Sequence, residues 1–179
     1  MTTEDTALSV AAVDAEAFSD ALVVAAQIYG EAMQRPPELV VQRREIMAAH
    51  LHRAGFAAAL ATDNDCVIGF CYGYHGRPGD WWHDVVARAV GRREAREWLS
   101  DSFELAELHV RPSHHGHGLG RRLLASVLDL ADGTTAVLST HDRESPARQL
   151  YRSVGFVDLL TGFVFPGSTE VYVVMGKRL

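Results

Sequence analysis

Two repeating patterns of hydrophobic and polar positions follow one another along the chain. Apolar residues spaced three and four apart indicate amphipathic helices, whereas alternating or short continuous apolar runs indicate strands. The helical pattern covers 15–33, 38–54, 81–99, 119–131 and 145–155. The strand pattern covers 8–13, 56–62, 66–75, 103–110, 134–140, 156–164 and 171–177. This order predicts a mixed α/β fold, and 179 residues suffice for one domain, 1–179.

Capping and turn residues mark where several of these elements begin and end. Asp14 and Ser145 are predicted N-caps, and Pro146 occupies the first helical position after Ser145. Pro36-Pro37 ends the first predicted helix. The turn at Asp63-Asn64-Asp65 joins two apolar runs, which predicts a β-hairpin.

Composition and charge exclude several classes of protein. The net charge is −6, and binding to a phosphate backbone relies on clustered Lys and Arg, so no nucleic-acid partner is expected. No apolar run approaches the roughly 20 residues of a membrane-spanning helix, and the acidic stretch 1–16 lacks the basic start of a signal peptide. Cys66 and Cys71 have odd spacing on one predicted strand, which disfavours a disulfide and predicts the reducing cytoplasm.

The stretch HHGHGLG, residues 114–120, permits two interpretations. Its histidines suggest a metal site or a pH sensor, but His114 and His115 are adjacent and point apart in most backbones, so no metal is expected. Its glycines lie between a predicted strand and a predicted helix, which favours a phosphate cradle. The unpaired N–H groups of a first helical turn and the helix dipole both attract a phosphate.

The residues of this loop support the phosphate interpretation. Gly116, Gly118 and Gly120 let the backbone approach a ligand, and the side chains of Arg121 and Arg122 can reach phosphate oxygens. The spacing matches neither G-x-G-x-x-G nor a Walker A loop, so the two common nucleotide motifs are not supported.

Two segments resemble the GNAT superfamily of N-acetyltransferases. The first, FELAELHVRPSHHGHGLGRRLL at 103–124, resembles that family's acetyl-coenzyme A motif, in which a strand, Val-x-Pro and Q/R-x-x-G-x-G/A precede a helix. The second, SPARQLYRSVGF at 145–156, resembles its A-x-x-L-Y-x-x-x-G-F segment. His115 stands where the family usually has Gln or Arg, and Glu144 stands where Asn is frequent. Two matches in the right order are more specific than either one.

The resemblance implies a single-domain GNAT-like fold with a central, mixed, mostly antiparallel sheet, splayed central strands and flanking helices. It also implies that acetyl-CoA is the co-substrate, without a metal, and that a primary amine of a small molecule or protein attacks it directly in a ternary complex. The acceptor is unidentified, and a homodimer is left open. The residues expected to bind the coenzyme are Leu108, His109, Val110, His115, Gly116, His117, Gly118, Leu119, Gly120, Arg121 and Ser145.

The resemblance also suggests catalytic residues. Glu107, on the strand before the loop, is the candidate base, with His109 on the same strand face or a water as alternatives. Glu104 faces the other way and is set aside. Tyr151 of the LYRSVGF match is the candidate acid for the thiolate, because a phenol is protonated at neutral pH. A backbone N–H around 108–110 is expected to meet the thioester carbonyl.

The sequence leaves open both the role of the residues on the acceptor side and the functional class of the protein. The segments that would wall the acceptor contribute Tyr74, Trp81, Trp82, His83 and Asp84, and the two tryptophans suit an aromatic lid or core anchors equally well. A non-catalytic acyl-CoA sensor of the same fold is the alternative function. An unrelated phosphate-ester binder is a third hypothesis.

Overall fold

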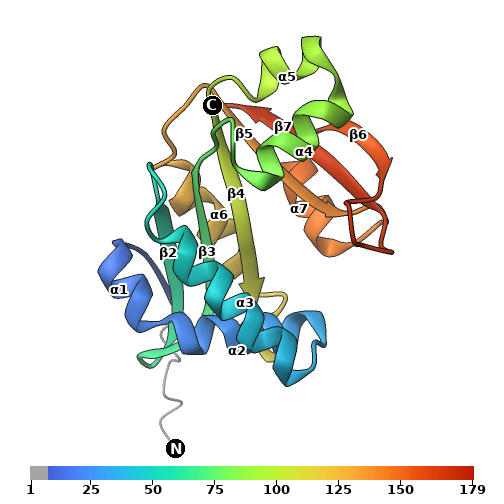
Figure 1. Cartoon of the computed structure of the whole chain (residues 1–179). Helices are drawn as coiled ribbons and strands as arrows, with labels where there is room; N and C mark the ends of the chain where they lie inside the picture. The colour runs from blue at the N-terminus through green and yellow to red at the C-terminus, as the bar shows by residue number, and fades with distance from the viewer. Residues whose placement is uncertain (1–7) are drawn as a thin grey trace, which may run out of the picture. The chain divides into compact units, whose positions relative to one another are not determined.

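A computed structural model describes residues 8–179 of the protein (Figure 1). Its strands are β1 (Leu8–Val13), β2 (Ala57–Asp63), β3 (Cys66–His75), β4 (Ser102–Val110), β5 (Thr135–His141), β6 (Val157–Phe163) and β7 (Tyr172–Arg178). Its helices are α1 (Ala15–Asp20), α2 (Leu22–Met33), α3 (Pro37–His50), α4 (Trp81–Val90), α5 (Arg92–Trp98), the 3₁₀ helix η1 (Pro112–His114), α6 (Leu119–Leu128) and α7 (Pro146–Ser153). The strands form one mostly antiparallel sheet in the order β1-β2-β3-β4-β5-β7-β6, which confirms the expected mixed α/β fold.

The chain divides into two compact units. The first comprises Met1–Tyr74 and Ala106–Leu130, and the second comprises His75–Leu105 and Ala131–Leu179. Residues 1–7, the start of the acidic stretch 1–16 that lacks the basic start of a signal peptide, lie outside the described part. Among the helices of residues 8–179, none combines the length and the apolar character needed to cross a bilayer.

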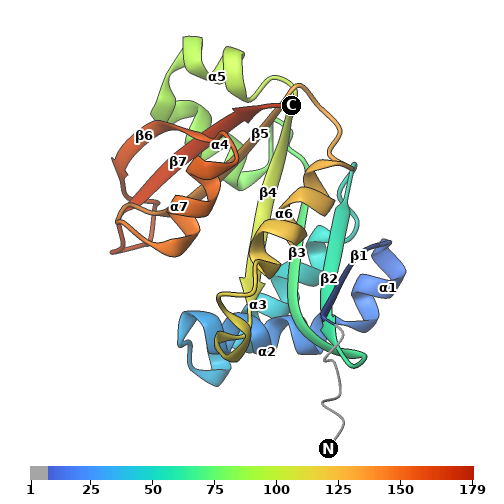
Figure 2. The same ribbon diagram turned by 180° about the vertical axis from the view of Figure 1, so that it is seen from behind.

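In the first unit, helices pack on both faces of the strands. α2 and α3 lie on one face and α6 lies on the other, as Figures 1 and 2 show from opposite sides. The core between the α1–α3 helices and the strands is aromatic: the fully buried ring of Phe18 lies 5.2 Å from that of Tyr72 and 6.0 Å from that of Phe70. Rings in tilted and edge-on contact at these distances contribute beyond the area that they bury.

Two local features shape this unit. A Cβ at Gly30 would come within 2.5 Å of the Val40 side chain, so the glycine lets α2 and α3 approach each other closely.

In the β2–β3 hairpin, Asn64 and Asp65 adopt φ angles of 45° and 67°. Two positive φ values are typical of a type I′ turn, which matches the twist of the flanking strands and confirms the predicted hairpin.

The second unit is built around β5, β7 and β6. β7 pairs with β5 from Thr135↔Arg178 to His141↔Tyr172, and β6 pairs with the other side of β7. α4 and α5 lie on one face of these strands and α7 lies on the other (Figures 1 and 2). β5 also pairs in parallel with the start of β4, but only from Ser102↔Thr135 to Glu104↔Val137. The expected splay of the central strands stays a prediction, because β4 from Ala106 onward belongs to the first unit.

Several predicted helix boundaries were wrong. The segment 15–33 forms two helices, because a turn at Ala21, whose N–H donates to the Phe18 carbonyl, interrupts it. The segment 81–99 breaks at Gly91, whose φ of 90° cannot continue a right-handed helix. The second helix ends at His50, before a set of turns, and α6 ends at Leu128.

The capping predictions were confirmed. The Asp14 carboxylate accepts a hydrogen bond from the N–H of Ala17 at 2.8 Å, and the Ser145 hydroxyl accepts one from the N–H of Arg148 at 3.2 Å. Each bond satisfies a backbone donor that a helix start leaves unpaired. Ser145 thereby fixes the start of α7.

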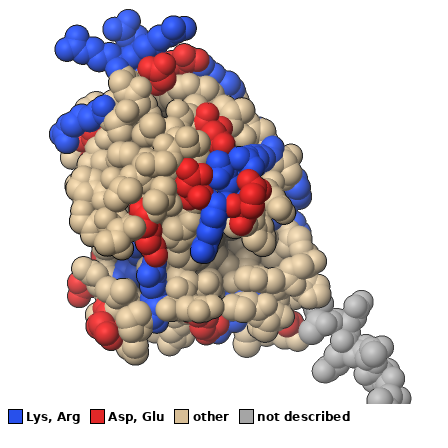
Figure 3. Space-filling view, turned by 90° about the vertical axis from the view of Figure 1, so that its right-hand side faces the viewer, with Lys and Arg blue, Asp and Glu red and all other residues tan. Residues whose placement is uncertain are grey.

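Ion pairs connect α7 to its neighbours within the second unit. Arg148, whose side chain is 8% exposed, donates to Asp142 at 2.6 Å and to Asp158 at 2.8 Å. Arg152, one turn later, pairs with Glu144 and with the same Asp158. Basic and acidic side chains are interspersed on the face seen in Figure 3, which is the side where β6 and α7 lie. Two guanidinium groups thus tie α7 to the segments before and after it.

Candidate functional site

Glu107 and His109 lie on one face of the part of β4 that belongs to the first unit. Residues two apart in a strand point to the same side, as the alternating pattern predicted. The Glu107 side chain is 8% exposed and that of His109 is 14% exposed. His109 Nε2 lies 2.7 Å from Glu107 Oε2, so the two side chains form a hydrogen-bonded pair.

The other oxygen of Glu107 is also occupied. Arg43 of α3 donates from Nη1 to Glu107 Oε1 at 3.0 Å. Burial alone would raise the pKa of Glu107, but the hydrogen bond and charge of His109, together with the charges of Arg43 and His50, outweigh it. The pKa of Glu107 therefore lies below its ordinary value, and the carboxylate is ionised at neutral pH.

His109 is held in place by aromatic rings as well as by Glu107. Its imidazole meets the ring of Tyr29 edge-on at 5.4 Å and that of Phe70 at 5.6 Å. An ionised carboxylate only accepts hydrogen bonds, so the nitrogen that faces Glu107 carries the proton. In the neutral imidazole this leaves Nδ1 as the basic nitrogen.

The glycine loop leads directly from this strand into α6. Gly116 and Gly118 adopt φ angles of 84° and 73°, a region that favours glycine, and no atom lies within 4 Å of a Cβ built at either one. Gly118 is the N-cap of α6 and provides no side-chain hydrogen bond to the helix. The first-turn N–H groups are therefore not capped by a side chain, and the backbone around them is open.

The two arginines after the loop differ in their placement. The N–H of Arg122 makes the first hydrogen bond of α6, to the Gly118 carbonyl at 3.1 Å. Its side chain donates to the carbonyl of Leu8 in β1 at 3.3 Å. One donor of Arg122 is therefore directed to β1, and its role at the loop stays a prediction. Arg121 remains a candidate.

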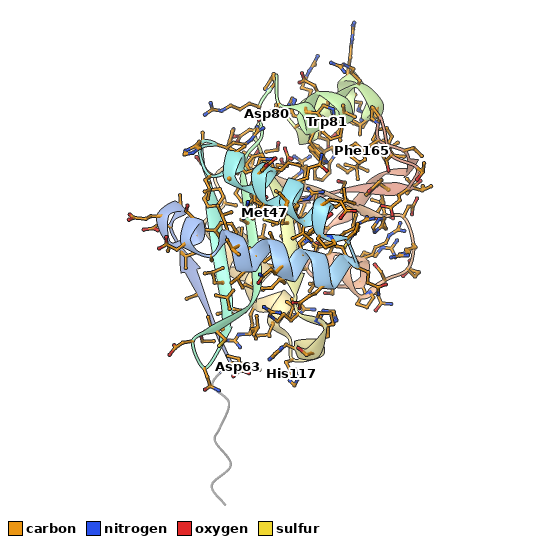
Figure 4. The ribbon with its side chains drawn as sticks, turned by 60° about the horizontal axis from the view of Figure 1, so that its bottom comes forward. Met47, Asp63, Asp80, Trp81, His117 and Phe165 are labelled. Carbon is orange, nitrogen blue, oxygen red and sulfur yellow. The ribbon has the colours of Figure 1, made fainter. Side chains whose placement is uncertain are left out.

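The histidines of the loop have separate roles. His114 bonds to Ser113 and to Asp63 of the β2–β3 hairpin. His115 donates from Nε2 to the Val110 carbonyl at 2.8 Å and so connects the loop back to β4. His117 is exposed and points outward from the loop (Figure 4). His115 thus braces the loop at the position where the family usually has Gln or Arg.

The described residues offer neither a metal site nor a reactive buried thiol. Across residues 8–179, no group of three or more His, Cys, Asp or Glu side chains is arranged to hold a metal ion. Cys66 is exposed and Cys71 is buried, and both are free thiols. Burial and the nearby charge of Glu107 raise the pKa of Cys71, so this thiol stays protonated and is a poor nucleophile.

The backbone of β4 directs its polar groups alternately to its two edges. The N–H of Arg111 donates to the Ile68 carbonyl of β3 at 2.8 Å, and the carbonyl of His109 also faces β3, beside Gly69. Because N–H and C=O directions alternate along a strand, those of Leu108 face the opposite edge. Within the predicted range 108–110, the N–H groups of Leu108 and Val110 therefore both point away from β3.

Tyr151 and Ser145 belong to α7 of the second unit. Tyr151 is 7% exposed, and its ring packs edge-on against Phe156 at 5.7 Å. The N–H of Phe156 donates to the Tyr151 carbonyl, which closes the end of the helix. Ser145 uses its oxygen to cap α7. Both residues of the second motif are therefore held rigidly within their unit.

The residues expected to line the acceptor side have varied surroundings. Trp81 is 58% exposed, and its ring lies 5.7 Å from that of Phe165. Figure 4 labels these two neighbouring side chains. Trp82 donates from Nε1 to Ser139. His83 is buried and bonds to Asp84 and to the Leu99 carbonyl. In the first unit, Tyr74 packs against His50 and Arg53. Trp82 and His83 are thus anchored within the second unit, whereas Trp81 presents its ring to solvent.

Sequence reasoning missed Arg43 and Tyr29 as parts of the candidate site. Arg43 falls within the predicted helical segment 38–54, between Leu39 and Met47 at spacings of four. That position lies on the stripe that contains the fully buried Met47. A half-buried cation next to a core position favours a nearby acidic partner, and this signal could have pointed to a carboxylate such as Glu107.

Comparisons with known proteins identify the family of this chain. The model of the Acetyltransferase (GNAT) family matches residues 22–156. A GCN5-like protein acetyltransferase of Mycobacterium tuberculosis is 29% identical over 192 residues, which covers 90% of this chain and 91% of the relative. The structure of yncA from Salmonella typhimurium, solved with its cofactor acetyl-CoA, has a TM-score of 0.68 at 19% identity and covers 97% of this chain and 94% of its own. The PaiA N-acetyltransferase of Thermoplasma acidophilum, in complex with coenzyme A, has a TM-score of 0.60 at 14% identity and covers 97% of this chain and 99% of its own. Because the family model spans most of the sequence, the chain belongs to the GNAT acetyltransferase family.

Proposed function

We propose that this protein is an acetyl-CoA-dependent N-acetyltransferase that transfers the acetyl group directly to a primary amine. The observation that carries the proposal is the buried Glu107–His109 pair on β4, a few residues before the open glycine loop of α6. An oriented proton acceptor and an anion-binding helix start are the two elements that acetyl transfer from a coenzyme A thioester needs.

The residues of the loop fit a pyrophosphate. The N–H groups of Leu119, Gly120 and Arg121 belong to the first turn of α6, where the helix dipole also attracts negative charge. The open space around Gly116 and Gly118 lets an anion approach the backbone. We assign coenzyme binding to 115–121, with His115 as the brace and His117 at the rim. Ser145 can donate its hydroxyl proton to the coenzyme while its oxygen caps α7.

The reaction requires one proton to leave the amine and one to reach the sulfur. His109 Nδ1 accepts the amine proton, while Glu107 holds the ring in the productive tautomer. The amine nitrogen then bonds to the acetyl carbon, and the carbon–sulfur bond breaks with its electron pair on sulfur. The N–H of Leu108 stabilises the carbonyl oxygen as charge develops there. The Tyr151 hydroxyl protonates the departing thiolate.

Replacement of Gly118 by alanine is expected to weaken coenzyme binding. A residue with a Cβ at a φ of 73° costs about 1–2 kcal/mol, so the loop will relax away from the cradle conformation. We expect the dissociation constant of coenzyme A to rise roughly tenfold in calorimetric titration. The matched control is Gly162→Ala in β6, also at positive φ with open space around it. Equal affinity of Gly118→Ala and wild type would contradict the cradle.

Replacement of Tyr151 by phenylalanine removes the proposed acid and leaves the ring that packs on Phe156. Turnover is expected to fall by about tenfold to a hundredfold, because general acid catalysis contributes on this scale or above. The affinity for coenzyme A should not change. Steady-state kinetics of thiol release measure both quantities, and unchanged turnover would remove Tyr151 from the acid role.

The acceptor is proposed only as a class, a primary amine of a small molecule or a protein. The M. tuberculosis relative is named a protein acetyltransferase, which supports a protein amine as the first acceptor to test.

We also propose that residues 1–179 form one acetyltransferase domain. The cytoplasmic location expected from the cysteines is likewise a proposal.

A thiol-release screen tests the proposed function. Purified protein and acetyl-CoA are incubated with peptides, amino acids, polyamines, aminoglycosides and arylamines. We expect amine-dependent release of coenzyme A with at least one class. Tight coenzyme binding without release from any class would instead favour the non-catalytic sensor. Competition by simple nucleotides as effective as that by coenzyme A would favour an unrelated phosphate-ester binder.

A further inference from the structure

Arg43 completes a closed ring of four side chains in the first unit. Its guanidinium donates to Glu107 Oε1 at 3.0 Å and lies 4.9 Å from the centre of the Tyr29 ring. The ring of Tyr29 meets His109 edge-on at 5.4 Å, and His109 bonds to Glu107 Oε2 at 2.7 Å. Each member therefore contacts the two members beside it, and the ring joins α2, α3 and β4.

We propose that Arg43 is a positioning residue, which keeps Glu107 ionised and turned so that Oε2 accepts the Nε2–H of His109. The proposal rests on the proposed function, because it assigns Arg43 a role in preparing the base of that reaction. A guanidinium has donors in a fixed plane, and its stacking on Tyr29 limits where they can point. With Oε1 held by Arg43, the carboxylate cannot rotate away from His109.

Electrostatics within the unit support this role. The buried Glu107 carboxylate would favour its neutral form without nearby cations, and Arg43 is a permanent one. The other titratable groups that interact with this carboxylate or with Arg43 are Tyr29 on α2, His50 on α3, Cys71 and Tyr72 on β3, and His109 on β4. Unlike the two histidines in this set, Arg43 cannot lose its positive charge near neutral pH. Its removal is therefore expected to make Glu107 easier to protonate.

The test compares Arg43→Gln with two other variants. In Arg43→Gln, the pH midpoint of the Glu107 side-chain carboxyl, followed by its ¹³C NMR signal, should rise by roughly one unit. The acid limb of kcat/KM should move in the same direction, and kcat at neutral pH should fall about tenfold with KM for acetyl-CoA unchanged. Arg43→Lys restores the charge and should return both midpoints toward wild type. Arg44→Gln, an exposed neighbour on α3, makes the same charge change and should shift neither.

The outcomes separate this role from a structural one and from the proposed function. If Arg43→Gln lowers only the melting temperature while the Glu107 midpoint stays within experimental error, the positioning role is overturned. Equal shifts in Arg43→Gln and Arg44→Gln would also overturn it, because they would reflect net charge alone. The NMR titration needs no substrate, so it tests Arg43 even if the thiol-release screen detects no acceptor and the proposed function fails.

Discussion

Replacing His109 with glutamine is expected to lower turnover by about a hundredfold or more, while coenzyme affinity stays within a factor of about two. Glutamine preserves the polarity of the position but cannot take up the amine proton at neutral pH. The His109 ring is 14% exposed and packs against Tyr29 and Phe70, so a melting curve must first show that the variant is folded. Rapid-quench kinetics at saturating acetyl-CoA then measure the acetyl-transfer step itself.

The variant Glu107→Gln, measured beside His109→Gln, tests whether the two side chains act together. An amide that still accepts from Arg43 turns its NH₂ toward His109, which reverses the tautomer of the ring and removes the basic nitrogen from its position. Because Glu107 and His109 act as a unit, the double variant should be only slightly slower than either single variant. His75→Gln, at the end of β3, is a control with an expected change of less than about twofold. Fully additive losses would show that the two side chains act independently.

Replacing Arg148 with methionine is expected to lower the melting temperature by about 5–10 °C at pH 7. Methionine fills a similar volume, but it leaves Asp142 and Asp158 without the guanidinium that they share. Breaking a largely buried ion pair from one side is costly, because the remaining charges lose their compensation. Arg152→Met on the same helix is the matched control. Its side chain is 41% exposed, so its loss should change the melting temperature by no more than about 2 °C.

The pH dependence of this effect has a definite sign. The backbone N–H of Gly162, together with Arg148, holds the pKa of Asp142 below its ordinary value. Burial would raise the pKa of Asp158, but Arg148 and Arg152 outweigh it and lower it. Carboxylates with depressed pKa values stabilise the fold above their unfolded pKa of about 4, and this contribution is lost as the pH falls through the folded values. Calorimetry should therefore find that the melting temperatures of the wild type and Arg148→Met converge as the pH falls below about 4, and a constant difference would contradict the role.

Much of the fold follows from residues with strong local preferences. Asp14, Ser145 and Pro146 mark helix starts, and the Asn64-Asp65 turn sets the hairpin, because each acts through its own backbone or side chain. The break at Gly91 was missed because the apolar spacing continues across it, and a glycine within a helical pattern is compatible with either outcome.

The candidate site was predictable only in part. The positions of Glu107 and His109 on one strand face follow from alternation, and the glycine loop follows from its place between a strand and a helix. The pairing of Glu107 with Arg43 joins residues 64 positions apart, and no local pattern records which helix packs on which strand. The sequence therefore suggested the carboxylate as the base, whereas its contacts with Arg43 and His109 favour the imidazole.

Transfer of a labelled acetyl group tests the central claim most directly. The protein is incubated with acetyl-CoA that carries ¹³C in the acetyl group and with an amine acceptor from the thiol-release screen. NMR then follows the thioester carbonyl and the new amide carbonyl. The wild type is predicted to form one amide for each thiol released, and Glu107→Gln/His109→Gln is predicted to bind coenzyme A normally but to form amide at least about a hundredfold more slowly. Amide formation by the double variant at the wild-type rate would contradict the account.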